Sequence, residues 1–316
     1  MSFELQIVLQ RLVLPAICSL IGCYMLSRTD QDEDWYDDEP VTGIAFLTIA
    51  GAFLCAIGMI GSDLWQRGIV LKPSDWSTWR PAYQWQWMVW MIPSSMLVLA
   101  LARSIFTIPI HYTAMAGVAV VSMSIGILYV CLNESVAWAA QSAKLLPWMA
   151  LSCLAVTWNI SSLNSIAKSN GSRWVSLTVL GQLGCVAAIV IQYYAGLAEW
   201  ALAGIGVAVG ASVVGALTGS KAKLHYGWQL STVVMPLGIM AVACLAVGSF
   251  TETTETKQLP DWLVGSVLFL PSLVCVVDIV FGRLTNAWFR VFLAACVCCV
   301  VLGAIFNITK PWQSDW

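Results

Sequence analysis

The residues of this chain best suited to chemistry are ionisable groups that stand inside long apolar runs. Glu134 lies in ILYVCLNESVAWAAQ, where apolar residues continue beyond it to Ala140. A charged side chain at the centre of a bilayer costs roughly 2.5 to 3.5 kcal/mol on insertion scales, so such a residue invites a functional explanation. If the helix continues to Gln141, Glu134 is embedded and suits the binding of a proton or a cation. If the helix ends near Asn133, Glu134 is an ordinary solvated carboxylate, and both alternatives remain.

Two further charged residues, Asp278 and Arg11, are candidates to bind an ion or a substrate. Asp278 lies in LVCVVDIVFGR, shortly before Arg283. A helix brings these two side chains close together, which favours a structural ion pair near the membrane surface over a transport carboxylate. Arg11 stands near the start of the first apolar run, and we expect its long side chain to extend to the near surface of the membrane. The alternative is that Arg11 holds an anionic substrate.

Amide side chains form another polar group, in the segment LAVTWNISSLNSI. Asn159 and Asn164 lie there, and Gln182 and Gln192 follow in the next apolar run. Buried amides in lipid usually form hydrogen bonds to a neighbouring helix, for about 0.6 to 2 kcal/mol each. We therefore expect Asn159 and Asn164 to join helices, with a polar substrate wall as the alternative.

The two histidines, His111 and His225, are each followed by tyrosine. A pair of histidines can bind haem or a metal ion. No other ligand set accompanies these two, so we predict no cofactor and no metal, and ligation by His111 and His225 is the lesser alternative. The chain has no nucleotide-binding, hydrolase or metalloprotease motif, and we predict no catalytic residue.

The composition identifies the surroundings in which these residues must work. Of 316 residues, 59% are hydrophobic and 10% are charged, whereas soluble domains carry about 25% charged residues. The chain therefore lacks the polar surface of a cytosolic enzyme, and it has no basic block that could bind nucleic acid. Its main partner is the lipid bilayer, and we expect an integral membrane protein, in the cytoplasmic (inner) membrane if the source is bacterial.

Apolar runs of about twenty residues recur along the whole chain, and each is long enough to cross the hydrocarbon core as a helix. The pattern predicts an all-α, polytopic bundle of about ten transmembrane spans with short loops, formed by residues 1–316 as one membrane domain. The predicted spans are 5–27, 42–62, 84–105, 113–133, 145–164, 174–195, 199–218, 231–250, 261–282 and 287–308.

Two predicted loops are longer than the rest. Residues 28–41 carry seven of the chain's seventeen acidic residues, and this acidic loop is a candidate docking site for protein partners. Residues 63–83 are rich in tryptophan, which prefers the membrane–water interface, so we expect this loop to lie along the bilayer surface. Lys and Arg are divided almost evenly between alternate loops, so the sequence predicts no orientation.

Three functions are compatible with these features. The first is a secondary transporter or permease-like protein that uses Glu134 and Asp278. The second is a non-catalytic membrane subunit or scaffold whose long loops bind partners. The third is a membrane redox protein that uses His111 and His225. No enzyme class is indicated, and the sequence identifies neither a substrate nor a partner.

Overall fold

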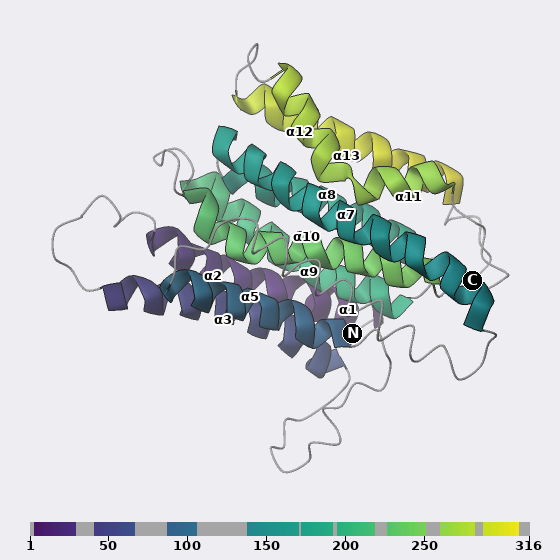
Figure 1. Ribbon diagram of the computed structural model, residues 1–316. Helices are drawn as coiled ribbons and strands as arrows, with labels where there is room; N and C mark the ends of the chain where they lie inside the picture. The colour runs from purple at the N-terminus through teal and green to yellow at the C-terminus, as the bar shows by residue number, and fades with distance from the viewer. Residues whose placement is uncertain are drawn as a thin grey trace.

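The computed structural model describes residues 3–29, 41–66, 87–105, 138–170, 172–191, 195–218, 226–250, 260–281 and 287–309. Within these ranges every regular element is a helix, which confirms the all-α prediction for the described part of the chain (Figure 1). In chain order the helices are α1 (Phe3–Val8), the π-helix η1 (Leu9–Val13), α2 (Leu14–Thr29), α3 (Val41–Gln66), α5 (Trp87–Ile105), α7 (Trp138–Asn170), α8 (Ser172–Val190), α9 (Ala195–Thr218), α10 (Tyr226–Phe250), α11 (Asp261–Leu268), α12 (Leu270–Phe281) and α13 (Ala287–Thr309).

Three helical segments of the described chain are long and apolar enough to cross a membrane. They are Leu5–Arg28, Phe46–Trp65 and Gly196–Thr218, and the bent pair α11–α12 makes a fourth if it is one span. Trp90–Ala102, Val175–Val190, Thr232–Ala246 and Phe292–Ile308 are apolar but shorter. The ten predicted spans are therefore not confirmed. The predicted span 113–133 lies outside the described residues.

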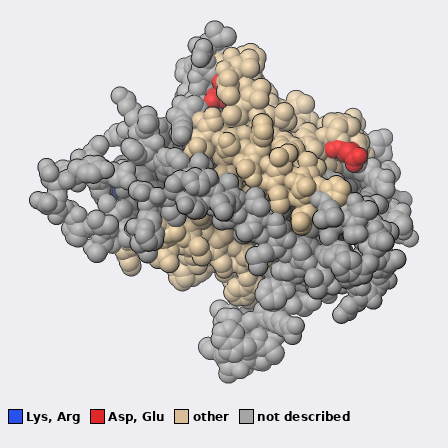
Figure 2. Space-filling view, in the orientation of Figure 1, with Lys and Arg blue, Asp and Glu red and all other residues tan. Residues whose placement is uncertain are grey.

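Most of the helices lie side by side along one common direction, whereas α11 and α12 meet at an angle of 66° (Figure 1). α11, α12 and α13 occupy one edge of the bundle, and α3 and α5 occupy the opposite edge. Between these edges α8 packs on α9, α10 and α13, while α2 packs on α3 and α9. The described surface in the view of Figure 2 is almost free of charged residues, apart from two small groups of acidic side chains.

α10 lies in the interior of the bundle. Residues 232–246 are buried without interruption, so no face of this stretch is exposed. Its contacts are with α5, α7, α8 and α9 among others. A helix that is apolar around its whole circumference can be enclosed in this way, because it presents no polar stripe that must reach water.

Glycines bring α2 very close to both α3 and α9. A Cβ atom on Gly51 of α3 would lie 2.6 Å from the backbone oxygen of Gly22 in α2. A Cβ atom on Gly210 of α9 would lie 2.7 Å from the backbone oxygen of Ala16. The sequence spacing of Gly206 and Gly210 predicts such an approach. A hydrogen bond from Ser19 Oγ to the Val207 oxygen, 2.7 Å long, joins the same two helices.

The close approach of α9 to α2 predicts opposite effects for two Gly→Ala substitutions. Gly210→Ala should lower the thermal unfolding temperature of the purified protein in detergent, because the new methyl group forces apart two packed backbones at a cost of about 1–3 kcal/mol. Gly303→Ala in α13 is the matched control, since a Cβ atom there meets nothing within 4 Å. It should leave the unfolding temperature unchanged or raise it, because alanine favours the helix. Equal effects of the two changes would contradict this account.

Candidate functional site

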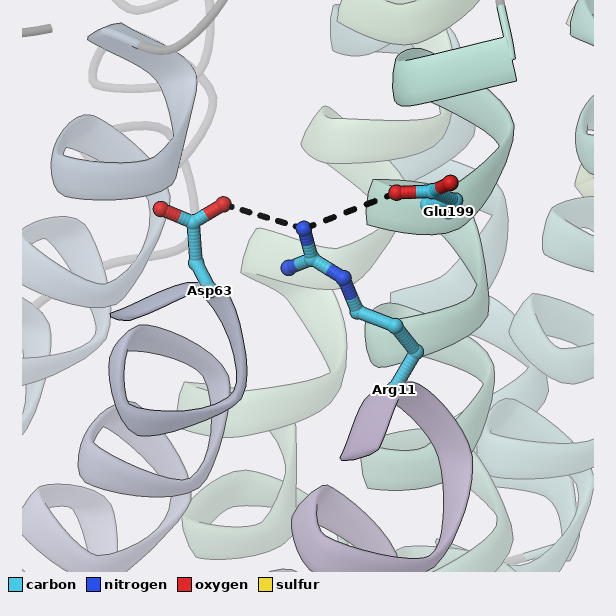
Figure 3. A network of polar contacts seen from close by, with 3 residues as sticks. All are labelled: Arg11, Asp63 and Glu199. Carbon is cyan, nitrogen blue, oxygen red and sulfur yellow. Dashed lines mark hydrogen bonds and ion pairs between the residues drawn. The ribbon is translucent and has the colours of Figure 1, made fainter. Parts of the chain in front are cut away.

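A buried arginine at the start of the bundle contacts two carboxylates from distant parts of the chain (Figure 3). Arg11 lies in η1, where the backbone N–H of Leu14 donates to the Leu9 oxygen, one residue beyond the α-helical spacing. Its Nη2 atom lies 3.1 Å from Oδ1 of Asp63 in α3 and 3.8 Å from Oε2 of Glu199 in α9. Single π turns inside α-helices are frequent at functional sites.

The three side chains, which we call the Arg11 cluster, differ in exposure. The side chains of Arg11 and Asp63 are 2% and 1% exposed, whereas that of Glu199 is 23% exposed. Asp63 accepts a hydrogen bond from Arg11, while the longer contact with Glu199 is an ion pair without one. With all three groups ionised, the cluster carries one positive and two negative charges. Because removal of such charges from water is expensive, each depends on the others.

The Arg11 cluster lies near one end of the three candidate spans. Arg11 follows Leu5 by six residues, Asp63 precedes Trp65 by two, and Glu199 follows Gly196 by three. At a helical rise of 1.5 Å per residue, all three are within about 10 Å of the ends of their spans. The prediction that Arg11 extends to the surface is wrong, because its guanidinium points to Asp63 and Glu199 inside the bundle.

Several polar atoms at or beside the cluster have no hydrogen-bond partner among the described residues. Arg11 donates through Nη2, and its Nε and Nη1 atoms make no hydrogen bond. The same holds for Ser62 Oγ and Trp200 Nε1, which belong to the residues next to Asp63 and Glu199 in the sequence. Buried donors without partners are rare in folded proteins, so each one invites a functional explanation.

A second polar group surrounds the break between α11 and α12, where the two helices meet at an angle of 66°. Pro271 has no N–H to donate to the Val267 oxygen, which is its partner in a continuous helix. The N–H of Ser272 donates instead to the Phe269 oxygen, at 2.9 Å. The Leu268 oxygen therefore receives no bond from Ser272 and is left for side-chain donors, while the Val267 oxygen also accepts from the N–H of Phe269.

Amide side chains from α7 and α8 supply those donors. Asn159 Nδ2 donates to the Leu268 oxygen at 2.7 Å, and Gln182 Nε2 donates to the Val267 oxygen at 3.1 Å and the Leu268 oxygen at 3.3 Å. Ser162 and Ser272 share a hydrogen bond of 3.1 Å between their hydroxyls. The expected hydrogen bond from Asn159 to a neighbouring helix is thus present, and its acceptor is the backbone at the break.

The other predicted site residues are not brought together with these two groups. Asn164 is half-buried in α7, and Asp278 is half-buried in α12. Glu134, His111 and His225 lie outside the described residues, as do Arg283, most of the acidic loop 28–41 and most of the Trp-rich loop 63–83. In the described ranges no group of three or more His, Cys, Asp or Glu side chains is arranged to hold a metal ion.

Two members of the Arg11 cluster, Asp63 and Glu199, are not among the residues predicted from the sequence. Asp63 is predicted as the first residue of a loop, but α3 continues to Gln66 and holds it inside the bundle. Glu199 is predicted only as the boundary of a span, although α9 begins at Ala195. The signal that identifies both is their charge next to a long apolar run.

Comparison of the chain with protein families, with curated proteins and with solved structures finds no match.

Proposed function

We propose that the protein is a proton-coupled secondary transporter whose coupling site is the Arg11 cluster. One observation carries the proposal: a guanidinium 2% exposed lies between two carboxylates of unequal exposure, contributed by separate helices. Ionisable groups within membrane-spanning helices are rare, and those present mark ion pathways, proton relays and substrate sites.

The geometry suits a division of roles between the two carboxylates. Asp63 is enclosed and forms the hydrogen bond that holds Arg11. Glu199 is more exposed and lies beyond hydrogen-bond distance, so it can gain or lose a proton while that hydrogen bond persists. A proton on Glu199 removes one negative charge from the cluster and weakens the attraction between α9 and η1. A proton gradient can therefore shift the packing of these two elements. Protonation removes the negative charge of Glu199, so it favours an arrangement in which the contact between Glu199 and Arg11 is absent.

The break between α11 and α12 supports the same proposal. Discontinuous helices recur in secondary transporters, where the substrate and the coupling ion bind beside the interruption. Asn159 and Gln182, which bond to the backbone at this break, would form part of a polar wall along the path of the substrate. Asn164 and Asp278 remain predicted members of that wall, and Glu134 remains a predicted proton or cation site.

Glu199→Gln should abolish proton coupling, because glutamine keeps the size of the side chain but cannot ionise. The measurement uses purified protein in liposomes that contain the pH-sensitive dye pyranine. Amino acids, sugars, organic anions and organic cations are added in turn with the outside more acidic than the inside. For wild type, one solute class should accelerate proton entry above that of protein-free liposomes, and Glu199→Gln should reduce entry to that background.

The matched control is Asp261→Asn, which neutralises an exposed carboxylate at the start of α11. It should transport protons as wild type does. If no solute class distinguishes wild-type liposomes from protein-free liposomes, the transporter proposal is wrong. If Glu199→Gln retains full coupling, the site is misassigned.

A membrane subunit or scaffold without transport activity is the second candidate. The observation in its favour is the filled interior at α10, where residues 232–246 are all buried. A scaffold needs no interior path, and it would leave proton entry unchanged for every solute class. The third candidate, a redox protein, depends on His111 and His225, and a purified protein with a haem Soret absorption band would support it.

A further inference from the structure

We propose that the substrate is a small organic anion with a single negative charge, whose carboxylate binds Arg11. This inference rests on the proposed transport function and names the substrate class of the same site. It concerns the guanidinium donors that neither Asp63 nor Glu199 uses.

The free donors of Arg11 call for an acceptor ligand. Its Nη2 atom makes both contacts of the cluster, while Nε on one edge of the guanidinium and Nη1 on the other have no partner among the described residues. The side chain is 2% exposed, so bulk water does not satisfy these donors. Each edge of the guanidinium includes Nη2, which already contacts Asp63 and Glu199. A ligand carboxylate can therefore be held through one oxygen, by a charge-assisted hydrogen bond from Nε or from Nη1.

The charges of the cluster restrict that ligand to one negative charge. With Asp63 and Glu199 ionised, the cluster sums to −1, and a proton on Glu199 brings the sum to zero. A monocarboxylate then restores −1, the starting value, while a doubly charged anion gives −2 beside the ionised Asp63. Because uncompensated charge is costly in a poorly solvated site, the proton and a single anionic group should enter together.

The position of the cluster indicates the end of the bundle from which the ligand would enter. Glu199 is the exposed member, and all three residues lie near the same end of their spans. An anion that enters from that end meets Glu199 before it reaches Arg11. While Glu199 is ionised it repels the anion, and once protonated it does not, so this residue couples the two movements.

The titratable and charged groups on the helices around Glu199 are consistent with its role in coupling the proton to the anion. η1, α2, α3, α8 and α10 pack against α9. Among side chains that the structure describes on these elements, the charged ones are Arg11, Asp63 and Arg28, and Arg28 contacts Tyr24 at the opposite end of the first span. The remaining titratable groups are the phenol of Tyr24 and the thiols of Cys18, Cys23, Cys55, Cys185 and Cys244. Among the side chains that the structure describes on these elements, Glu199 and Asp63 are thus the carboxylates able to govern access to Arg11.

The test measures uptake of labelled solutes into proteoliposomes under an inward proton gradient. The probes are the monocarboxylates lactate, gluconate and glucuronate, with citrate, phosphate, glucose and tetraethylammonium as comparison solutes. At least one monocarboxylate should accumulate, and the comparison solutes should not. Because one proton and one monoanion carry no net charge together, uptake should not change when potassium and valinomycin clamp the membrane potential at different values.

Variants separate binding from coupling. Glu199→Gln should lose accumulation driven by the proton gradient, yet it should still exchange labelled for unlabelled monocarboxylate across the membrane, because Arg11 and Asp63 remain. Arg11→Gln should lose both activities, and Asp261→Asn should keep both.

The outcomes distinguish failure of the anion assignment from failure of the transporter proposal. Proton-coupled uptake of a comparison solute in place of a monocarboxylate would overturn the anion assignment and leave the transporter proposal standing. Monocarboxylate uptake that follows the membrane potential would overturn the entry of one proton with one anion that the charges of the cluster predict. Loss of exchange in a folded Glu199→Gln protein would also overturn the anion assignment. Failure of every solute to enter would overturn both proposals.

Discussion

Asp63→Leu should destabilise the protein more than any other single change in the Arg11 cluster. The substitution leaves a guanidinium that is 2% exposed without its hydrogen-bonded carboxylate, and Glu199 lies 3.8 Å away. Removal of one partner of a buried ion pair typically costs about 3–5 kcal/mol. We expect Asp63→Leu to give little monodisperse protein on size-exclusion chromatography in detergent. Glu199→Leu should be milder, because that side chain is partly exposed and its contact is longer.

A double substitution keeps this prediction testable if Asp63→Leu does not fold. Arg11→Met combined with Asp63→Leu replaces the ion pair by two apolar side chains of similar length. Such replacements are often neutral or stabilising, so the double variant should be recovered as a monodisperse protein with an unfolding temperature close to that of wild type. If the double variant is no better than Asp63→Leu alone, loss of packing rather than the unpaired charge is the cause. The double variant should also show no transport.

The second large effect is expected at the break between α11 and α12. Asn159→Leu combined with Gln182→Leu removes every side-chain donor that the structure gives to the Val267 and Leu268 oxygens. A buried acceptor left without a donor costs about 1–3 kcal/mol. The Leu268 oxygen is left in this way, and the Val267 oxygen keeps the N–H of Phe269 alone. The double variant should therefore lower the thermal unfolding temperature, measured by tryptophan fluorescence in detergent, by more than either single variant does.

Asn164→Leu is the matched control for that experiment. Asn164 lies in α7 as Asn159 does, but it is half-buried and the structure gives it no bond to the break. Its replacement should change the unfolding temperature little. An equal effect of Asn164→Leu and Asn159→Leu would show that the amide–carbonyl bonds at the break contribute nothing particular to stability.

The helices could be predicted from the sequence because their signal is local. A run of apolar residues such as 42–62 or 287–308 specifies a helix by its own composition, and described helices occupy both ranges. The number of membrane crossings could not be predicted in the same way. Composition alone does not distinguish a helix that faces lipid from one enclosed by other helices, and 232–246 in α10 is enclosed.

The Arg11 cluster could not be predicted because its members are far apart in the chain. Arg11 and Asp63 are separated by 52 residues, and Glu199 belongs to the other half of the sequence. The sequence shows that Arg11 is a charge in an apolar run, but it does not show what lies opposite. The amides at the break were easier to find, because Asn159 is conspicuous in an apolar helix, although its acceptor depends on Pro271 and the bend of another element.

The enclosure of α10 bears on how the chain is assembled during synthesis. α5, α7, α8 and α9 leave the ribosome before α10, and all four contact it in the finished bundle. The surfaces of these helices that face residues 232–246 therefore stay uncovered until that stretch is synthesised. A nascent chain that ends before Tyr226 exposes the apolar surfaces that α10 would cover, and chaperones and quality-control proteases can bind them. The core of the bundle is therefore completed only when α10 has been synthesised.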